Sequence, residues 1–338
     1  MKDLIHPNRR QAMRLMAAAT AATPLLYASS NVEAAEHTLK LASLAPPGSV
    51  WFKAIQSVAR QVKEKTDGAI AFKIYGGGTM GDERAMVRKM RTGQLDGAVV
   101  TSVGLGDIDK QLLVLQLPLT FKSSAQLDKV RGAMSGTFDG ILEKQGFARL
   151  GWGDVGFNYL FSNSPVATIA DAKKLKMWVW DLDPVVKTVA KVAGINGVPM
   201  GVPDVLPSLQ SGKVDAFLNS PYGAIALQWH TKATHVTNLK LAVTIGGTVV
   251  STKGTWSKLS DGQKDIIRAA SDEAHKGLLG KVRKANQAAI ADLGSKHGIK
   301  AVEPKDFAAW QKIADAVRKE MTGSVFPKAL VDTMRGHL

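Results

Sequence analysis

The sequence predicts an α/β fold of two lobes, and three features of the chain lead to this prediction. Strand and helix patterns alternate along residues 38–100. A short pattern of helix end, glycine and aspartate near residue 93 occurs again near residue 212. One helical pattern, over residues 260–293, is longer than a lobe of ordinary size. The alternation favours parallel strand pairs with helices on the faces of the sheet.

Apolar spacing defines the first elements. Leucine alternates with polar residues over 38–43, and Ile70, Phe72 and Ile74 fall on one strand face. The expected elements, in order, are a strand over 38–43, a helix over 51–65, a strand over 70–74, a helix over 82–91 and a strand beginning near Asp96.

The repeated pattern covers residues 90–98 and 209–217. In both copies a helix ends, a glycine takes the C-cap position and an aspartate precedes a strand. Two copies more than a hundred residues apart fit two similar lobes. We expect Asp96 and Asp215 to fix loops as hydrogen-bond acceptors.

The longest predicted helix begins near Ser260, whose side chain can cap it together with Asp261. Apolar residues recur at steps of three or four from Ile267 to Leu293, so that one face can be buried. More than thirty residues at about 1.5 Å each span roughly 50 Å. The helix is therefore expected to bridge both lobes.

Residues 1–35 have the order of a secretory signal peptide. A basic head is followed by an apolar run over residues 15–26 and by small residues before residue 35. The pair Arg9 and Arg10 hints at twin-arginine export. We expect a periplasmic protein that is not embedded in the membrane, because no later stretch is apolar enough to span a bilayer.

The chain is basic and lacks cysteine. Residues 1–35 hold four basic and two acidic residues, which leaves 40 Lys and Arg against 27 Asp and Glu, a net charge of +13. Such a charge is compatible with nucleic acid, anionic lipid or an acidic partner. The basic residues are spread evenly, so no nucleic-acid partner is expected. Without cysteine, disulfides and Cys-based zinc sites are excluded.

A glycine-rich segment over residues 76–81 formally matches the dinucleotide-binding pattern G-x-G-x-x-G. It lies well after the first strand–helix unit, and an exported protein has little access to NAD. We therefore expect a turn at this position and no cofactor.

Signatures of enzymes and of metal sites are absent from the sequence or incomplete. There is no H-E-x-x-H and no G-x-S-x-G motif. His230 and His235 lack an obvious third ligand, and Asp181 and Asp183 precede Pro184 in an expected turn, where capping is their usual role. We therefore expect no catalytic residues, no metal and no enzyme.

Four segments resemble the solute-binding proteins of tripartite ATP-independent periplasmic (TRAP) transporters. The resemblance implies two α/β lobes joined by crossing strands, with the long helix across both, that close on a ligand. The segments are G-G-T-M-G-D-E at 77–83, L-P-L-T-F at 117–121, V-P-M with L-P-S-L-Q-S-G-K-V-D-A at 198–216, and W-S-K-L-S-D-G-Q at 256–263.

The resemblance also implies a function and a division of the chain. We expect residues 37–155 with 247–280 to form lobe I, and residues 156–246 with 281–338 to form lobe II. The liganded protein would dock transiently on TRAP membrane subunits that an ion gradient drives. Two other interpretations stay open: a ligand sensor or carrier of hydrophobic molecules with this fold, and a periplasmic enzyme built on it.

One departure from the family pattern concerns the ligand. In a segment like L-K-x-R-V-P, the family's arginine usually grips a carboxylate, whereas this chain has L-K-M-W-V-W at 175–180, with Trp178 in the place of the arginine. Loss of the guanidinium removes charge-assisted bonds of about 1.5–3 kcal/mol each. An indole offers apolar area instead, and burial of that area contributes at most about 4–6 kcal/mol to the binding free energy. This change favours an apolar, aromatic or cationic-amine ligand over a small carboxylate.

The remaining candidate residues follow strands or resemble family segments that line the site. Interior packing is the alternative role for each of them, Trp178 included. The predicted ligand-binding residues are Ser49, Trp51, Thr101, Phe121, Trp178, Trp180, Phe217, Asn219 and Tyr222.

Overall fold

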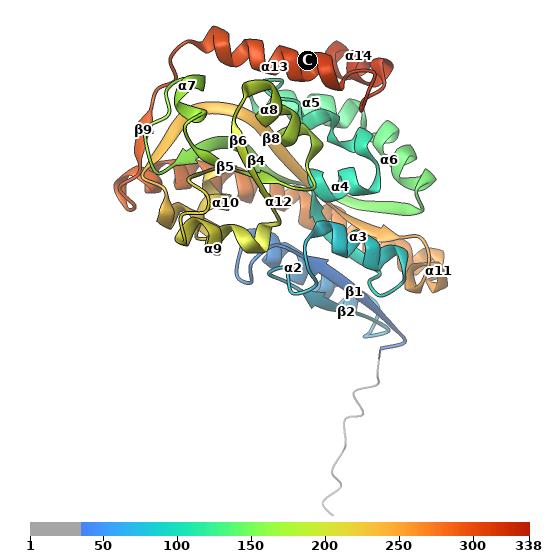
Figure 1. Cartoon of the computed structure of the whole chain (residues 1–338). Coiled ribbons are helices and arrows are strands. Elements are labelled where there is room, and N and C mark those ends of the chain that lie inside the picture. Colours follow the sequence, from blue (N-terminus) through green and yellow to red (C-terminus); the bar gives the residue numbers. More distant parts are fainter. Residues whose placement is uncertain (1–34) are drawn as a thin grey trace, which may run out of the picture. The chain divides into compact units, whose positions relative to one another are not determined.

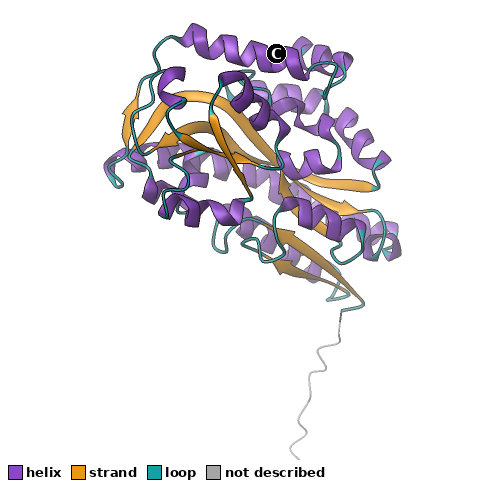
Figure 2. Cartoon of the chain, viewed as in Figure 1, coloured by secondary structure: helices purple, strands orange, loops and turns teal. Residues whose placement is uncertain are grey.

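Two long antiparallel strands, β4 (Phe147–Ser162) and β8 (His235–Ser251), pair along most of their length at the centre of one mixed sheet. The computed structural model describes residues 35–338, in which helices cover the sheet (Figures 1 and 2). The predicted signal peptide, apart from Ala35, and the pair Arg9 and Arg10 lie outside the described residues.

The other strands are β1 (His37–Ser43), β2 (Ile70–Tyr75), β3 (Gly97–Thr101), β5 (Lys176–Trp180), β6 (Asn196–Met200), β7 (Ala216–Asn219) and β9 (Lys300–Val302). The sheet order is β2-β1-β3-β8-β4-β7-β5-β6, with β9 paired to β8. We call β2, β1 and β3 the first half of the sheet, and β7, β5 and β6 the second half. Within each half, neighbouring strands are parallel, as the alternation of strands and helices predicts.

The helices cover both halves. They are α2 (Val50–Lys65), α3 (Glu83–Arg91), α4 (Ser102–Ile108), α5 (Ser124–Ala133), α6 (Ser135–Lys144), α7 (Ile169–Ala172), α8 (Pro184–Ala193), α9 (Val205–Gln210), α10 (Pro221–Ala226), α11 (Thr255–Lys258), α12 (Asp261–Ser295), α13 (Phe307–Met321) and α14 (Lys328–Gly336). Short 3-10 helices are η1 (Lys110–Gln116), η2 (Val202–Asp204) and η3 (Trp229–Lys232).

The two central strands join the halves because they pair with each other and each also pairs with a strand of one half. The end of β8 pairs with β3, from Gly246 to Val250, whereas the end of β4 pairs with β7. The β4–β8 register shifts between Asp154 and Gly156 and again between Asn158 and Leu160. Such bulges bend a strand and increase its twist. The chain therefore changes direction where it passes from one half of the sheet to the other.

The long helix is confirmed, and it contacts both halves. Ser260 caps α12 in a capping box, accepting from the Gln263 backbone N–H while the Gln263 side chain accepts from the Ser260 N–H. Along its length α12 packs against α2, β4 and α10. Since α2 follows β1 of the first half and α10 follows β7 of the second half, α12 connects the two halves.

The C-terminal helices also reach both halves. In Figure 1, α13 and α14 run along one side of the molecule, next to the label for the C-terminus. Contacts join α13 to α8, which follows β5, and α14 to η1, which follows β3 and α4. The predicted division gives residues 281–338 wholly to lobe II, but α14 packs on an element of lobe I.

The repeated pattern has the same backbone arrangement in both copies. The glycines that end the two helices, Gly93 and Gly212, have φ angles of 75° and 70°. The carboxylate of Asp96 accepts from the backbone N–H groups of Lys40 and Thr255. Its counterpart Asp215 accepts from the backbone N–H of Lys176. The prediction that these aspartates fix loops is confirmed.

Candidate ligand-binding site

A cavity of about 150 Å³ lies where the two halves of the sheet meet. Its wall combines residues from β1, β3 and α3 with residues from β5, β7 and α10, and the central strands supply the rest. Five of the nine predicted ligand-binding residues line it: Trp51, Thr101, Trp178, Trp180 and Asn219. The other four lie elsewhere.

Trp178 and Trp180 occupy alternate positions of β5, which places both indoles on one side of the strand. The structure buries both of them, with ring centroids 5.9 Å apart. The Nε1–H of Trp178 donates to the Met200 carbonyl at 3.1 Å, and that of Trp180 donates to Asp82 Oδ2 at 2.9 Å. Because both N–H groups have protein partners, the indoles offer a ligand only their apolar surface.

The third indole, that of Trp51, comes from the first turn of α2. Its Nε1–H donates to the Asp154 carbonyl at 2.9 Å, and its ring lies 4.8 Å from that of Tyr222. Tyr222 does not line the cavity, but its hydroxyl oxygen accepts from the Val50 backbone N–H. Ser49 is likewise outside the lining and caps α2 by accepting from the Phe52 N–H. The Tyr222 bond holds the N-terminal ends of α2 and α10 together, and Ser49 satisfies the first turn of α2.

The two predicted phenylalanines pack in the interior. Phe121 is buried with the apolar residues of α5 and η1. Phe217 stacks on Phe161 at 5.0 Å and meets the edge of Trp229 at 5.4 Å. Neither lines the cavity. For both residues the structure shows the interior packing that the sequence left open as the alternative.

Glu83, the first residue of α3, lines the cavity and is fully buried. Its carboxylate accepts from the Thr101 backbone N–H at 2.8 Å, the Thr101 hydroxyl at 2.9 Å and the Gly104 N–H at 2.6 Å. Burial away from water nevertheless raises the pKa of Glu83 from 4.5 to about 8. Three donors hold the carboxyl group in place, and no basic side chain of the described residues pairs with it.

The pH dependence of stability should report the raised pKa of Glu83. A carboxyl group with a raised pKa contributes stability that is present at low pH and is lost as the pH rises from 4.5 to about 8. The loss is roughly 1.4 kcal/mol for each pH unit in that interval. We expect Glu83→Gln, which cannot ionise, to flatten the fall in unfolding free energy between about pH 5 and 8. Urea unfolding at several pH values measures this slope.

The exposed Asp315 provides the control for that experiment, since Asp315→Asn removes a carboxylate from the surface of α13. This control should keep the slope of the unmodified protein. An equal slope in Glu83→Gln would contradict the burial of a protonated Glu83.

Asp183 is the second buried carboxylate of the wall. Its Oδ1 accepts from the backbone N–H groups of Val185 and Val186, so it caps α8 as the sequence predicts. Its Oδ2 accepts from Gln116 Nε2, and Gln116 Oε1 in turn accepts from the Ser102 hydroxyl. Burial raises the pKa of Asp183 to about 6. This chain of bonds joins the first half of the sheet to the second across the cavity.

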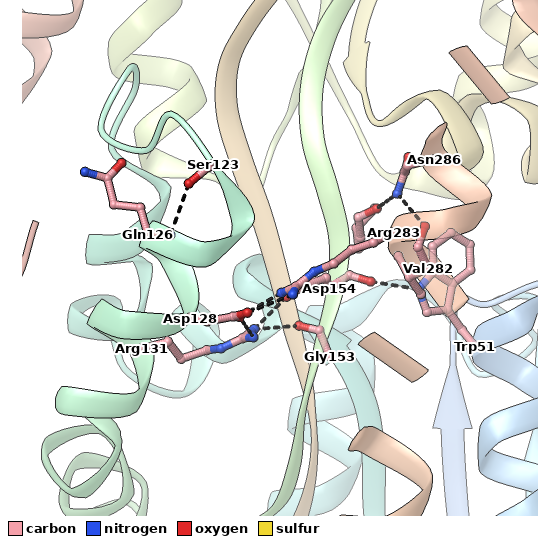
Figure 3. A network of polar contacts seen from close by, with 11 residues as sticks. Trp51, Ser123, Gln126, Asp128, Arg131, Gly153, Asp154, Val282, Arg283 and Asn286 are labelled. Atoms are coloured by element: carbon pink, nitrogen blue, oxygen red, sulfur yellow. Dashed lines mark hydrogen bonds and ion pairs between the residues drawn. The ribbon is translucent and has the colours of Figure 1, made fainter. Parts of the chain in front are cut away.

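The third carboxylate of the wall is paired, in contrast to the other two. Asp154 lies at the β4 bulge and accepts from Arg131 Nη1 at 2.6 Å and from Arg283 Nη2 at 2.8 Å. Both guanidinium groups also bind Asp128, so two positive and two negative charges form one network (Figure 3). The network connects α5, β4 and α12 where the central strands bend. Its net charge is zero.

Asn158 was missed in the sequence because nothing local distinguishes it within β4. It lines the cavity, is 8% exposed and donates from Nδ2 to the Thr244 hydroxyl at 2.8 Å. Asn219 is also 8% exposed and accepts from the Ser220 N–H through Oδ1. Within residues 35–338, Asn158 Oδ1 and Asn219 Nδ2 make no hydrogen bond. These two amide atoms remain available for hydrogen bonds to a ligand.

The described residues include no cluster of three side chains suited to a metal ion. His230 donates from Nδ1 to the Ala224 carbonyl and packs its ring 4.4 Å from that of His297. Among the described residues that line the cavity there is also no lysine and no arginine. The wall is thus largely aromatic and aliphatic, and its polar part consists of amide groups, carboxyl groups, hydroxyl groups and the imidazole of His275.

A mixed α/β sheet in two halves, with a largely apolar cavity between them, defines a protein that holds a small solute. The model of the bacterial extracellular solute-binding protein family 7, DctP, matches residues 41–324, and the chain belongs to this family. No described helix is both long enough and apolar enough to cross a membrane.

Curated relatives cover most of the chain. A solute-binding protein of Chromohalobacter salexigens is 28% identical over 292 residues, which are 85% of each chain. The sialic acid-binding periplasmic protein SiaP of Vibrio cholerae is 26% identical over 317 residues, covering 90% of this chain and 94% of that protein.

Solved structures share the fold. A TRAP periplasmic solute-binding protein from Citrobacter koseri with bound D-glucuronate matches with a TM-score of 0.81 at 26% identity, covering 88% of this chain and 98% of that one. Another, from Ralstonia eutropha with bound (S)-2-acetolactate, matches with a TM-score of 0.83 at 24% identity, covering 89% and 98%. At the lower identity the likeness shows the fold alone.

Proposed function

We propose that this chain is the periplasmic solute-binding subunit of a TRAP-type importer and that it captures a small ligand with an apolar or aromatic body. The ligand occupies the cavity between lobe I (37–155 with 247–280) and lobe II (156–246 with 281–338). The lobes close on it, and the liganded protein docks on membrane subunits without chemical turnover of the ligand.

The observation that carries the proposal is the composition of the cavity wall. Trp51, Trp178 and Trp180 supply three indole surfaces, and no lysine or arginine stands among the described lining residues. The relatives from Citrobacter koseri and Ralstonia eutropha hold carboxylates. A carboxylate in a dry cavity needs a cation or several N–H donors. Asp183, which has no ion-pair partner among residues 35–338, would instead repel one.

Contacts across the cavity support closure as part of the function. Asp82 Oδ2 accepts from Trp180 Nε1 and from the Val202 backbone N–H, which ties the start of α3 to β5 and η2. The Tyr222 hydroxyl accepts from the Val50 N–H on the far side. Such bonds form only when the two lobes approach each other, so they stabilise the closed form.

The test is extraction of the purified mature protein under denaturing conditions, followed by mass spectrometry of the released small molecules. We expect a compound with an aromatic or branched aliphatic body and no free carboxylate. The stripped and refolded protein should rebind that compound and should not bind D-glucuronate. Release of a uronic acid, or tight binding of D-glucuronate by the refolded protein, would overturn the proposed ligand class.

A further inference from the structure

We propose that the ligand carries a positively charged nitrogen, held by the carboxylate of Asp183 and the indole of Trp180. The inference rests on the proposed function, since it assigns a charge to the ligand of the same cavity. The apolar surface of the cavity wall does not by itself determine the sign of that charge.

The first observation is a mismatch among the three carboxylates that line the cavity. Asp154 has two guanidinium partners, whereas Glu83 and Asp183 form no ion pair with any described residue. Lys187, one helical turn beyond Asp183, is exposed and does not pair with it. Buried carboxylates are normally paired or bound to a cation. With its pKa at about 6, Asp183 is ionised at neutral pH whereas Glu83 is protonated, so a cationic ligand would supply the partner that Asp183 lacks among the described residues.

The second observation is the position of Trp180 beside Asp183. Its indole N–H is bonded to Asp82, the residue before Glu83, and its carbonyl accepts from the Asp183 backbone N–H at 3.0 Å. Trp180 and Asp183 both line the cavity, and the turn between them keeps them close along the chain. A cation gains energy over the face of a tryptophan, and more so where water is excluded. The carboxylate of Asp183 and the indole face of Trp180 thus both favour a cationic group.

Asn158 and Asn219 provide an independent indication that polar ligand atoms bind here. Each is more than nine-tenths buried, lines the cavity and has one amide atom without a hydrogen-bond partner in residues 35–338. Neither free atom is sealed in the protein interior, so both can be reached from the cavity. Their presence indicates a ligand that combines its apolar body with hydrogen-bonding groups.

An organic ammonium fits this wall better than a metal ion. Metal ions need several oxygen or nitrogen ligands around one point. The described residues contain no such cluster, and most of the wall is indole and aliphatic surface. An ammonium group attached to an aromatic or aliphatic body uses both parts of the wall.

Asp183→Asn removes charge while the structure can keep every hydrogen bond. The remaining oxygen still caps α8 through Val185 and Val186, and asparagine caps helices as well as aspartate does. If the Gln116 amide turns over, its oxygen accepts from the new amide and its nitrogen donates to the Ser102 hydroxyl. The variant therefore tests charge without a cost in packing.

Asp306→Asn is the matched control, because Asp306 caps α13 by accepting from the Ala309 N–H and does not line the cavity. Calorimetric titration would use three probes with similar bodies: 2-phenylethylamine, 2-phenylethanol and 3-phenylpropanoate. They carry a positive, a neutral and a negative group respectively. The unmodified mature protein and both variants are titrated at neutral pH.

We expect the amine to bind at least about tenfold more tightly than the alcohol, and the acid to bind most weakly. Asp183→Asn should erase the preference for the amine, while Asp306→Asn keeps it. An amine that binds no better than the alcohol, including the case in which neither binds, overturns the inference. Equal binding of amine and alcohol leaves the proposed apolar ligand class standing, whereas preference for the acid contradicts both proposals.

Discussion

Asp154→Ala is expected to lower the free energy of unfolding by about 3–5 kcal/mol. The carboxylate of Asp154 is 4% exposed at its side chain and binds two guanidinium groups, of which that of Arg131 is 5% exposed. Without it, Asp128 is the only carboxylate of the network left for two guanidinium groups, so one positive charge is no longer neutralised. Breaking one side of a buried ion pair costs more than the pair contributes, because the remaining charge is not solvated.

Urea unfolding measures this loss, and two variants make the result specific. Asp265→Ala removes a carboxylate that pairs with Arg268 at 3.0 Å on the exposed surface of α12, and it should cost less than about 1 kcal/mol. Replacing Asp154 and Arg131 together, by Leu and Met, should recover part of the loss, because no charge then stays buried alone. A cost for Asp154→Ala as small as that for Asp265→Ala would mean that the network is solvated.

Trp178→Ala is expected to abolish ligand binding and to lower the free energy of unfolding by about 3–5 kcal/mol. The indole is 6% exposed, lines the cavity and meets the edge of Trp229 at 4.9 Å. Its removal takes away both the surface that a ligand would contact and the packing of the second half of the sheet. Binding of the compound extracted from the native protein, and urea unfolding, measure the two effects.

Two further variants separate binding from stability. Trp310→Ala removes a tryptophan of similar burial that lies outside the cavity, so it should lower stability alone. Trp178→Phe keeps an aromatic face and loses the bond to the Met200 carbonyl, so it should retain part of the binding. Full binding by Trp178→Ala would show that the indole is interior packing and that the ligand lies elsewhere.

Local patterns predicted much of the fold. The helix expected over residues 260–293 is α12, Asp261–Ser295, and its cap is the expected Ser260. The aspartates of the repeated pattern hold the same type of loop in both halves of the sheet. Periodicity, caps and turn glycines depend on interactions between residues a few positions apart, and a sequence displays these directly.

The candidate site was predicted less completely, because lining a cavity depends on neighbours from distant segments. Phe217 follows the correct strand pattern, yet its ring stacks in the interior, while Asn219 two positions later reaches the cavity. Asn158 carried no local signal at all. Asp183 was predicted as a helix cap, which it is, but the pattern did not reveal its burial.

The sequence by itself determined the α/β class and the long capped helix. Tertiary structure decided the charge and the shape of the cavity. Gln116 bonds to Asp183 across 67 residues of chain, and Arg283 bonds to Asp154 across 129. Whether a buried carboxylate is paired or left for a ligand depends on such contacts, and only the folded chain brings their partners within bonding distance.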